Sequence, residues 1–515
     1  MKNSKLILSV RKFLSVLFLA FPLLVMGGNL FPVPSIKVGS TKISGHIDTA
    51  LFPRQVTGMA YRVTIFNPVT GNAVYENKVD KNGMFNIDVP LECNVAFGSL
   101  NLFVNDEYYQ SVFIGLDQAS ALKLNIILDG SGGMKTDMQG GLNLTPSEGD
   151  KIIKSTMIFD EHYTWGNYYK MSPDEFVKYE LEVSLKDRIK AATDSLGLSN
   201  RVVAYLTDSY RLRYAQGRLF HYKETVEESY RGTYENDKEI SRYKVLEPDR
   251  AYYSFLRQFN LNNPQYLYCY TYADFMKAFL QIKAFHIPEI GNTPVRQWIE
   301  GVKTEIQEVV GFDSGLFYDM LAATAYDLQL SDKNEPLSDM QIIHIKDYYS
   351  GNNKDFASIL IKQNDTLKNK LDSSRNLEIN ETPAVEKENL MDAIVSKYKG
   401  KVVLVDFWAT WCSPCQAAIK SMEVLKREFK NKEIAFVYIT GSTSPKETWR
   451  NQIKIIGGEH YYFTKEEWKY VTDSLGFNLI PSYLIYDASG ALVHKITGFP
   501  GTEEIRGFLK NLLPD

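Results

Sequence analysis

Residues 30–145 alternate between apolar and polar positions, which is the period of a half-buried β-strand. The alternation is clearest in Tyr61–Ile65, Phe85–Val89 and Leu122–Ile126, where every second side chain is apolar. Turn-forming residues such as Asp80–Gly83 separate these segments. The pattern predicts an N-terminal antiparallel β-sandwich-like domain, for which we expect a spacer or docking role without chemistry of its own.

Residues 150–375 change to the three-to-four-residue spacing of amphipathic helices, which predicts a central all-α domain. Ser172–Glu175 has the pattern of a capping box with proline at the first helical position. This segment is rich in tyrosine and phenylalanine, as in Tyr252–Phe255 and Tyr266–Tyr270. We interpret these aromatic residues as core. The alternative is an apolar face that receives a partner or an unfolded substrate.

Residues 373–383 are expected to be a linker, and residues 380–515 after it alternate between short apolar runs and helical patterns. The predicted strands are Val402–Phe407, Ile434–Thr440, Tyr483–Tyr486 and Ala491–Thr497, and the predicted helices are Asn389–Tyr398, 415–428 and Glu503–Leu513. A segment at Pro445–Leu475 is inserted between the second and third strands. This order predicts an α/β domain whose mixed sheet carries helices on both faces.

Composition and charge are those of an ordinary multi-domain globular protein. The chain has 515 residues, 44% hydrophobic and 23% charged, with a formal net charge of −4. A nucleic-acid partner is not expected, because such proteins need a basic face. Residues 1–28 combine basic positions with an apolar run, Phe13–Met26, which predicts a signal peptide and export to the periplasm; a retained membrane anchor is the alternative.

The candidate chemistry lies directly after the first predicted strand of the C-terminal domain. There Cys412-Ser413-Pro414-Cys415 leads into a helix start. A thiol at a helix N-terminus faces unpaired N–H groups and the positive end of the helix dipole, which stabilise its thiolate. We expect Cys412 to be the exposed nucleophile and Cys415 the buried resolving thiol, with exchange through a mixed disulfide. Pro414 removes one N–H and stiffens the first turn, so the Ser413-Pro414 pair is expected to influence the redox potential.

The stretch VDFWATWCSPC resembles the active site of a thioredoxin fold, and residues 380–515 are similar to the TlpA/ResA-like extracytoplasmic thiol-disulfide oxidoreductases. The resemblance implies that Trp411 forms part of the surface around the disulfide. It also implies that Pro481 is a cis-proline and that Ile480, which precedes it, offers backbone hydrogen bonds to a substrate chain. The segment that contains Glu459–Tyr462 resembles the extra helix and strand of this group.

Asp406 lies within the apolar strand before the site, where an isolated charge is costly. The resemblance implies that this carboxyl accepts the proton of Cys415. A structural carboxylate paired to a backbone donor is the alternative. Thioredoxins carry a lysine near this carboxyl on the next strand, but Ile434–Thr440 has none, so the tuning of Asp406 is an open question at this stage.

Other chemistries have little support in the sequence. Gln416 rather than histidine follows the dicysteine, which argues against covalent haem attachment, and no second C-x-x-C exists to complete a zinc site. We therefore expect no metal and no cofactor beyond the Cys412–Cys415 pair. Cys93 and Cys269 are expected to be buried small hydrophobic residues.

The sequence thus favours an extracytoplasmic thiol-disulfide oxidoreductase that reduces protein disulfides and takes its electrons from a membrane donor. The motif does not distinguish this from a disulfide oxidase or isomerase that uses the same cysteines. An envelope interaction module with a redox-sensing thioredoxin domain is the alternative from another class.

Overall fold

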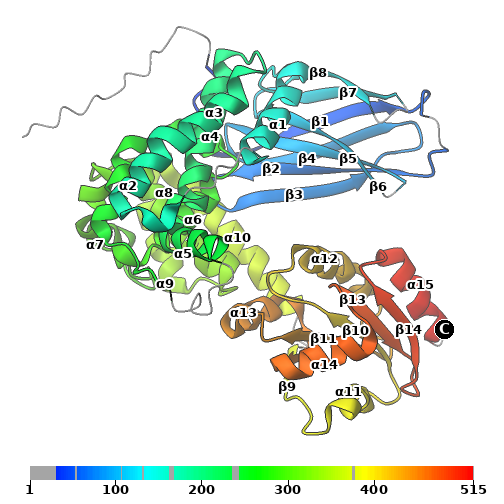
Figure 1. The fold of residues 1–515 in the computed structure, drawn as a ribbon. Helices are drawn as coiled ribbons and strands as arrows, with labels where there is room; N and C mark the ends of the chain where they lie inside the picture. The colour runs from blue at the N-terminus through cyan, green and yellow to red at the C-terminus, as the bar shows by residue number, and fades with distance from the viewer. Residues whose placement is uncertain are drawn as a thin grey trace, which may run out of the picture.

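The computed structural model describes residues 30–52, 55–105, 107–129, 133–161, 167–234, 243–373 and 377–513. The predicted signal segment, residues 1–28, lies outside these ranges. The described chain forms two stacked β-sheets, then a helical region, then an α/β domain (Figure 1). No helix within the described ranges has the length and apolar character needed to cross a membrane.

The first region is a sandwich of two four-stranded sheets. Its strands are β1 (Ile36–Asp48), β2 (Met59–Asn67), β3 (Gly71–Lys78), β4 (Met84–Cys93), β5 (Val95–Val104), β6 (Glu107–Asp117), β7 (Leu122–Leu128) and β8 (Met134–Gly140). The sheet orders are β4-β1-β7-β8 and β3-β2-β5-β6. Alternate residues of both sheets, such as Ile43, Val63 and Leu124, share one buried cluster, so the predicted alternation does mark the inner faces.

One strand pair departs from the predicted antiparallel arrangement. β1 and β7 run parallel, with Ile43 opposite Leu122. The prediction was wrong here because the whole second sheet lies between these strands in sequence. A tight turn forces an antiparallel pair, whereas so long a connection leaves the direction free.

The helical region follows. Its α-helices are α1 (Pro146–Glu161), α2 (Pro173–Tyr179), α3 (Leu185–Asp194), α4 (Asn200–Gly217), α5 (Tyr222–Thr233), α6 (Tyr272–Leu280), α7 (Val295–Val310), α8 (Leu316–Asp327), α9 (Asp339–Tyr348) and α10 (Lys354–Ser373). The predicted capping box is present, since the Ser172 hydroxyl accepts from the Glu175 N–H and the Glu175 carboxylate accepts from the Ser172 N–H.

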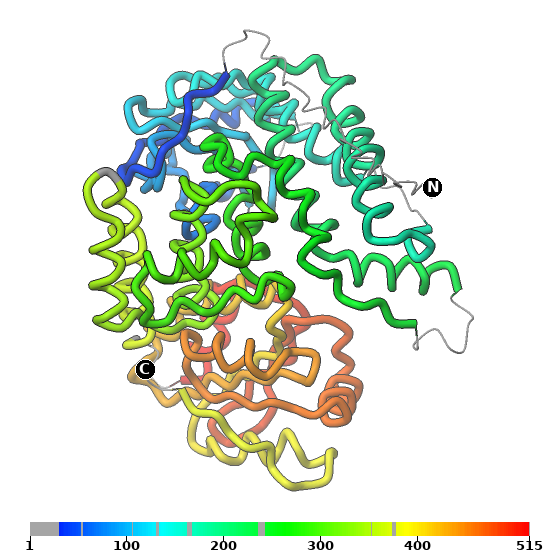
Figure 2. Tube along the Cα trace, turned by 90° about the vertical axis from the view of Figure 1, so that its left-hand side faces the viewer, coloured from blue at the N-terminus to red at the C-terminus, as the bar shows by residue number. Residues whose placement is uncertain are grey.

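The aromatic residues of the helical region are core, as predicted. Tyr205 and Tyr268 pack against Phe97 of β5, with ring centroids 4.5 and 5.1 Å from it. The outer face of the second sheet and the helices therefore share a continuous apolar cluster. The last helix of this region, α10, contacts β1 at one end and α13 (Lys446–Ile456) of the last domain at the other (Figure 2).

The C-terminal domain is a six-stranded mixed sheet with helices on both faces. Its elements are β9 (Leu377–Asn380), α11 (Leu390–Ser396), β10 (Val402–Phe407), α12 (Ser413–Glu428), β11 (Ile434–Gly441), α13 (Lys446–Ile456), β12 (Gly458–Phe463), α14 (Lys465–Leu475), β13 (Ser482–Tyr486), β14 (Leu492–Thr497) and α15 (Thr502–Leu512). The strand order is β14-β13-β10-β11-β12-β9. The apolar clusters on the two faces place α11 and α14 on one side and α12 and α15 on the other.

The predicted linker at 373–383 contains a strand, β9, which pairs in parallel with β12. The prediction of a linker was wrong for these residues because β9 is a four-residue edge strand. So short a segment shows too little alternation to stand out, and its structure comes from pairing with β12.

The C-terminal domain contacts the helical region through α13. The Asn334 side chain donates to the Asn451 carbonyl at 2.9 Å, and the Lys454 ammonium donates to the Lys333 carbonyl at 3.0 Å. In Figure 1, α13 lies on the side of the domain that faces the helical region. This helix also borders the dicysteine.

Candidate functional site

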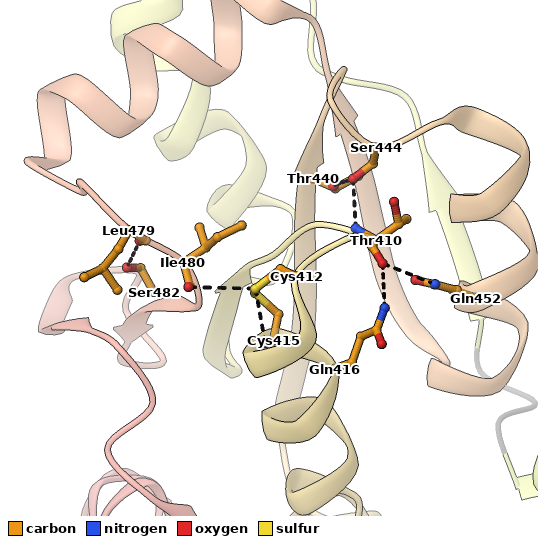
Figure 3. Close-up of a disulfide and its surroundings, with 10 residues drawn as sticks. All are labelled: Thr410, Cys412, Cys415, Gln416, Thr440, Ser444, Gln452, Leu479, Ile480 and Ser482. Carbon is orange, nitrogen blue, oxygen red and sulfur yellow. Dashed lines mark hydrogen bonds between the residues drawn. A yellow bond between two sulfur atoms is a disulfide. The ribbon is translucent and has the colours of Figure 1, made fainter. Parts of the chain in front are cut away.

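The dicysteine lies at the junction between β10 and α12, where the sequence predicts it. Cys412 is the N-cap of α12, and its Sγ accepts a hydrogen bond from the Cys415 N–H at 3.2 Å. The two cysteines form a disulfide, with Cα atoms 5.3 Å apart (Figure 3). Ser413 begins the helix, and Pro414 occupies its first turn, where a missing N–H costs nothing. The disulfide therefore lies at the positive end of a 16-residue helix.

Cys412 is less exposed than expected. Its exposed fraction is 4%, against 0% for Cys415. The prediction of an exposed nucleophile is wrong for this oxidised form, because the loop before β13 lies against the sulfur. The Cys412 Sγ is 3.8 Å from the Ile480 carbonyl oxygen (Figure 3). The order of accessibility between the two cysteines nevertheless follows the prediction.

The loop that covers Cys412 contains a cis peptide bond between Ile480 and Pro481, as the resemblance implied. Apolar side chains on both segments beside the disulfide reach solvent, since Trp411 is 61% exposed and Leu479 is 50% exposed. Exposed large apolar residues on adjoining segments are typical of a surface that binds another chain.

A hydrogen-bond network holds the turn before Cys412. The Thr410 N–H donates to the Ser444 hydroxyl at 3.0 Å, and the Thr410 carbonyl accepts from the side chains of Gln416 and Gln452 (Figure 3). Ser444 in turn bonds the Thr440 hydroxyl at 2.7 Å. These contacts attach the active-site turn to β11, α12 and α13.

Asp406 is buried in β10, the strand that precedes the disulfide, with an exposed fraction of 1%. Neither carboxylate oxygen has a hydrogen-bond partner among the described residues. The alternative of a carboxylate paired to a backbone donor is therefore wrong in the described structure. Burial raises the pKa of Asp406 well above its usual range, and the positive charge of Lys426 partly opposes this shift.

Asp406 belongs to a row of polar side chains that crosses four adjacent strands. Strand register places Tyr483 of β13 and Tyr438 of β11 on either side of it, and His460 of β12 next to Tyr438. We call Tyr483, Asp406, Tyr438 and His460 the polar row. Each member is buried and has at least one polar side-chain atom without a partner among the described residues.

The polar row faces α12. His460 is its last member, and the imidazole of this residue is neutral. The His460 ring stacks on Tyr438 with centroids 5.0 Å apart. Burial lowers the pKa of His460 to about 3, with a smaller effect in the same direction from Lys426. His460 therefore carries no charge at neutral pH, and the ionisable charges at this site belong to Asp406 and Lys426.

Lys426 is the site residue that sequence analysis missed. Its ammonium donates to the Gly457 carbonyl at 3.0 Å and also to the Ile456 carbonyl, and it lies 5.0 Å from the centre of the Tyr438 ring. The signal was present in the sequence, because Lys426 follows Cys415 by eleven positions, close to three full helical turns. It therefore lies on the same face of α12 as the buried cysteine.

The remaining candidates have no visible role in chemistry. Cys93 and Cys269 are free and buried, as predicted, and burial raises the pKa of each thiol well above its usual range. Within the described ranges, the structure contains no cluster of three or more histidine, cysteine, aspartate or glutamate side chains that could hold a metal ion.

Comparison with known proteins places similarity in the C-terminal domain. Residues 380–511 match the Redoxin family model. The thiol-disulfide oxidoreductase ResA of Bacillus anthracis is 25% identical over 118 residues, which cover 22% of this chain and 66% of the relative. The thioredoxin-like protein YneN of Bacillus subtilis is 43% identical over 61 residues, covering 12% of this chain and 32% of the relative. The chain thus spans 66% of the length of the first ResA relatives that it matches.

Two solved structures are similar to part of the chain. The thioredoxin domain of a thiol-disulfide oxidoreductase from Bacteroides vulgatus is 22% identical and covers 22% of this chain and 83% of that chain, with a TM-score of 0.20. A thioredoxin-family thiol:disulfide interchange protein from Chlorobium tepidum is 25% identical and covers 23% of this chain and 83% of that chain, also with a TM-score of 0.20.

Proposed function

We propose that this chain, whose C-terminal region is a TlpA/ResA-like thioredoxin-fold domain, is a thiol-disulfide oxidoreductase that reduces disulfides in other proteins. One observation carries the proposal: the Cys412–Cys415 disulfide lies at a helix N-terminus and against the Ile480 carbonyl. The helix end stabilises a thiolate, and the adjoining loop offers a backbone edge to an incoming chain.

The reaction begins from the dithiol form. The Cys412 thiolate attacks one sulfur of the substrate disulfide, which forms a mixed disulfide and releases the first substrate thiolate. Cys415 then gives its proton to the Asp406 carboxylate and attacks the Cys412 sulfur. This step forms the Cys412–Cys415 disulfide and releases the second substrate thiolate. Two electrons pass to the substrate, and each released thiolate takes up a proton.

We assign the residues around the disulfide to two roles, binding of the substrate chain and control of the redox reaction. Trp411 contributes an exposed apolar surface, and the Ile480–Pro481 loop contributes backbone groups that bond an extended substrate. Ser413 and Pro414 shape the first turn, and the potential of the couple depends on that turn. Asp406 acts as the proton acceptor for Cys415. This role is supported by the burial of Asp406 and by the lack of hydrogen-bond partners for its two oxygens among the described residues.

We further infer that the protein acts outside the cytoplasm, in the periplasm or attached to the membrane that faces it. The basic and apolar pattern of residues 1–28 supports export. Because the reductase direction consumes the dithiol, a membrane electron donor must restore it.

The test is the equilibrium reduction potential of the Cys412–Cys415 couple, measured in defined glutathione mixtures with Cys415→Ala as the control. A value at or below about −250 mV is expected for a reductase, whereas a value above about −180 mV would assign an oxidase or isomerase. Absence of any reversible couple would overturn the enzyme proposal and leave an interaction module.

A further inference from the structure

The four strands of the polar row carry no lysine or arginine. A lysine of α12, Lys426, supplies a cation beside the row. Asp406 sits in the row between Tyr438 and Tyr483. Lys426 comes from α12, on the helical face that also carries Cys415, and its ammonium lies over the Tyr438 ring at 5.0 Å. Tyr438 therefore links the three groups: it shares an apolar cluster with Cys415, lies next to Asp406 in strand register, and carries the Lys426 ammonium over its ring.

The ammonium is held from the far side by the end of α13. It donates hydrogen bonds to the carbonyls of Ile456 and Gly457, where α13 ends. Carbonyls at a helix C-terminus carry the negative end of the helix dipole and favour a cation. Part of the Lys426 side chain reaches the surface, but its charged end points inward among these carbonyls and the rings of Phe436 and Tyr438.

We propose that Lys426 is the positioning residue for the resolving step: its ammonium keeps the Asp406 carboxylate available to accept the proton of Cys415. This inference rests on the proposed function. Lys426 touches neither substrate nor the reacting sulfurs and acts through Asp406. A cation on α12 thus replaces one that β11 lacks.

The charges around this pair are consistent with the proposal. Lys426 and Asp406 each favour the charged form of the other. Glu423 on α12 also favours a charged Lys426, whereas His460 is neutral and the two tyrosines of the polar row keep their protons. Burial lowers the pKa of Lys426 to about 8, so the ammonium is still mostly charged at pH 7.

The experiment follows the resolving step directly with 5,5′-dithiobis(2-nitrobenzoate). The reduced full chain attacks the reagent through Cys412 and releases one thionitrobenzoate. Resolution by Cys415 then releases the second, so the rate of the second phase reports proton transfer from Cys415. This rate is measured as a function of pH.

Four variants separate charge from structure. Lys426→Met removes the charge and the hydrogen bonds, and Lys426→Gln removes the charge while its amide still donates to the α13 carbonyls. Lys420→Met is the matched control, an exposed lysine of the same helix. Asp406→Asn removes the proposed acceptor, and is combined with Lys426→Met in a double-mutant cycle.

In both Lys426 variants we expect the pH at which the second-phase rate is half-maximal to rise by about one unit. At pH values below this midpoint, the rate should fall roughly tenfold. Lys420→Met should follow the parent profile. In the Asp406→Asn background, Lys426→Met should produce no further shift. The glutamine side chain is chosen because it can still donate to the α13 carbonyls. If Lys426→Met fails to fold, Lys426→Gln still tests the loss of charge.

Two results would overturn the proposal. One is an unchanged profile in Lys426→Gln while Asp406→Asn alters it. The other is a full shift that persists in the Asp406→Asn background, which would mean that Lys426 acts on the thiol without Asp406. A parent protein with no second phase would instead refute the dithiol reaction itself, so failure of the proposed function is distinguishable.

Discussion

Two buried aspartates in this chain have opposite surroundings. Asp327, at the end of α8 in the helical region, is fully enclosed and paired with Lys277 at 2.8 Å. It also accepts hydrogen bonds from Ser331 and Gln363. Asp406 in the C-terminal domain is as deeply buried, but neither of its oxygens has a partner among the described residues.

The difference matches the roles that we propose, a structural one for Asp327 and a proton-accepting one for Asp406. A buried charge that is paired and hydrogen-bonded is satisfied, and removing its partner is costly. A buried carboxyl without hydrogen-bond partners has a raised pKa, and a carboxyl with a raised pKa is a better proton acceptor once it is ionised. The surroundings of Asp406 therefore fit the proposed role in proton transfer, which would come at a cost in stability, whereas those of Asp327 fit a structural role.

Breaking the Lys277–Asp327 ion pair should have the largest effect on the free energy of unfolding. Lys277→Met leaves Asp327 charged and uncompensated inside the helical region, so the free energy of unfolding should fall by about 3 to 5 kcal/mol. Chemical denaturation measures this, with Lys283→Met as the control, because Lys283 is 84% exposed. A loss no greater than in the control would remove the contrast between the two aspartates.

Removing the Asp406 carboxylate, the proposed proton acceptor, should change the free energy of unfolding by a smaller amount and in the opposite direction. Asp406→Asn should raise the free energy of unfolding by about 2 kcal/mol at pH 8, since it ends the burial of a charge that no hydrogen bond satisfies. The pKa of Asp406 is higher in the folded than in the unfolded chain, so its penalty grows as pH rises. The gain should therefore shrink when denaturation is repeated at pH 5; a pH-independent gain would contradict this account.

Glu92 in β4 is an intermediate case and should show the smallest effect. It accepts hydrogen bonds from the Val69 N–H, the Thr70 N–H and the Thr70 hydroxyl, but no cation pairs with it among the described residues. Burial raises its pKa to about 7. Stability from this group is present at low pH and is lost as pH rises through 7.

Glu92→Gln should therefore flatten the pH dependence of stability between pH 5 and pH 8. The parent protein should lose about 1 to 2 kcal/mol more than the variant over this range, because one pKa unit corresponds to about 1.4 kcal/mol. Thermal unfolding at matched pH values measures the difference. Parallel pH curves would show that the hydrogen bonds to Glu92 already satisfy its charge.

Local patterns in the sequence were sufficient for most elements. Strand β10 was predicted at Val402–Phe407, where the structure has it, because a short apolar run before a helix has few other interpretations. The capping box at Ser172 and the dicysteine at the start of α12 are also local, since each depends on residues within one helical turn. Edge strand β9 was missed because four residues carry too weak a period.

The sequence by itself determined the position of the dicysteine on α12, the burial of Asp406 and the periodicity of the main elements. Only the tertiary structure decided that β1 and β7 run parallel, and that Tyr483, Asp406, Tyr438 and His460 form one row. It also brought Lys426 to this row. The physical reason is that periodicity acts between neighbours in the chain and shows which face of a helix a residue occupies, whereas strand register and charge pairing between different elements leave no such pattern.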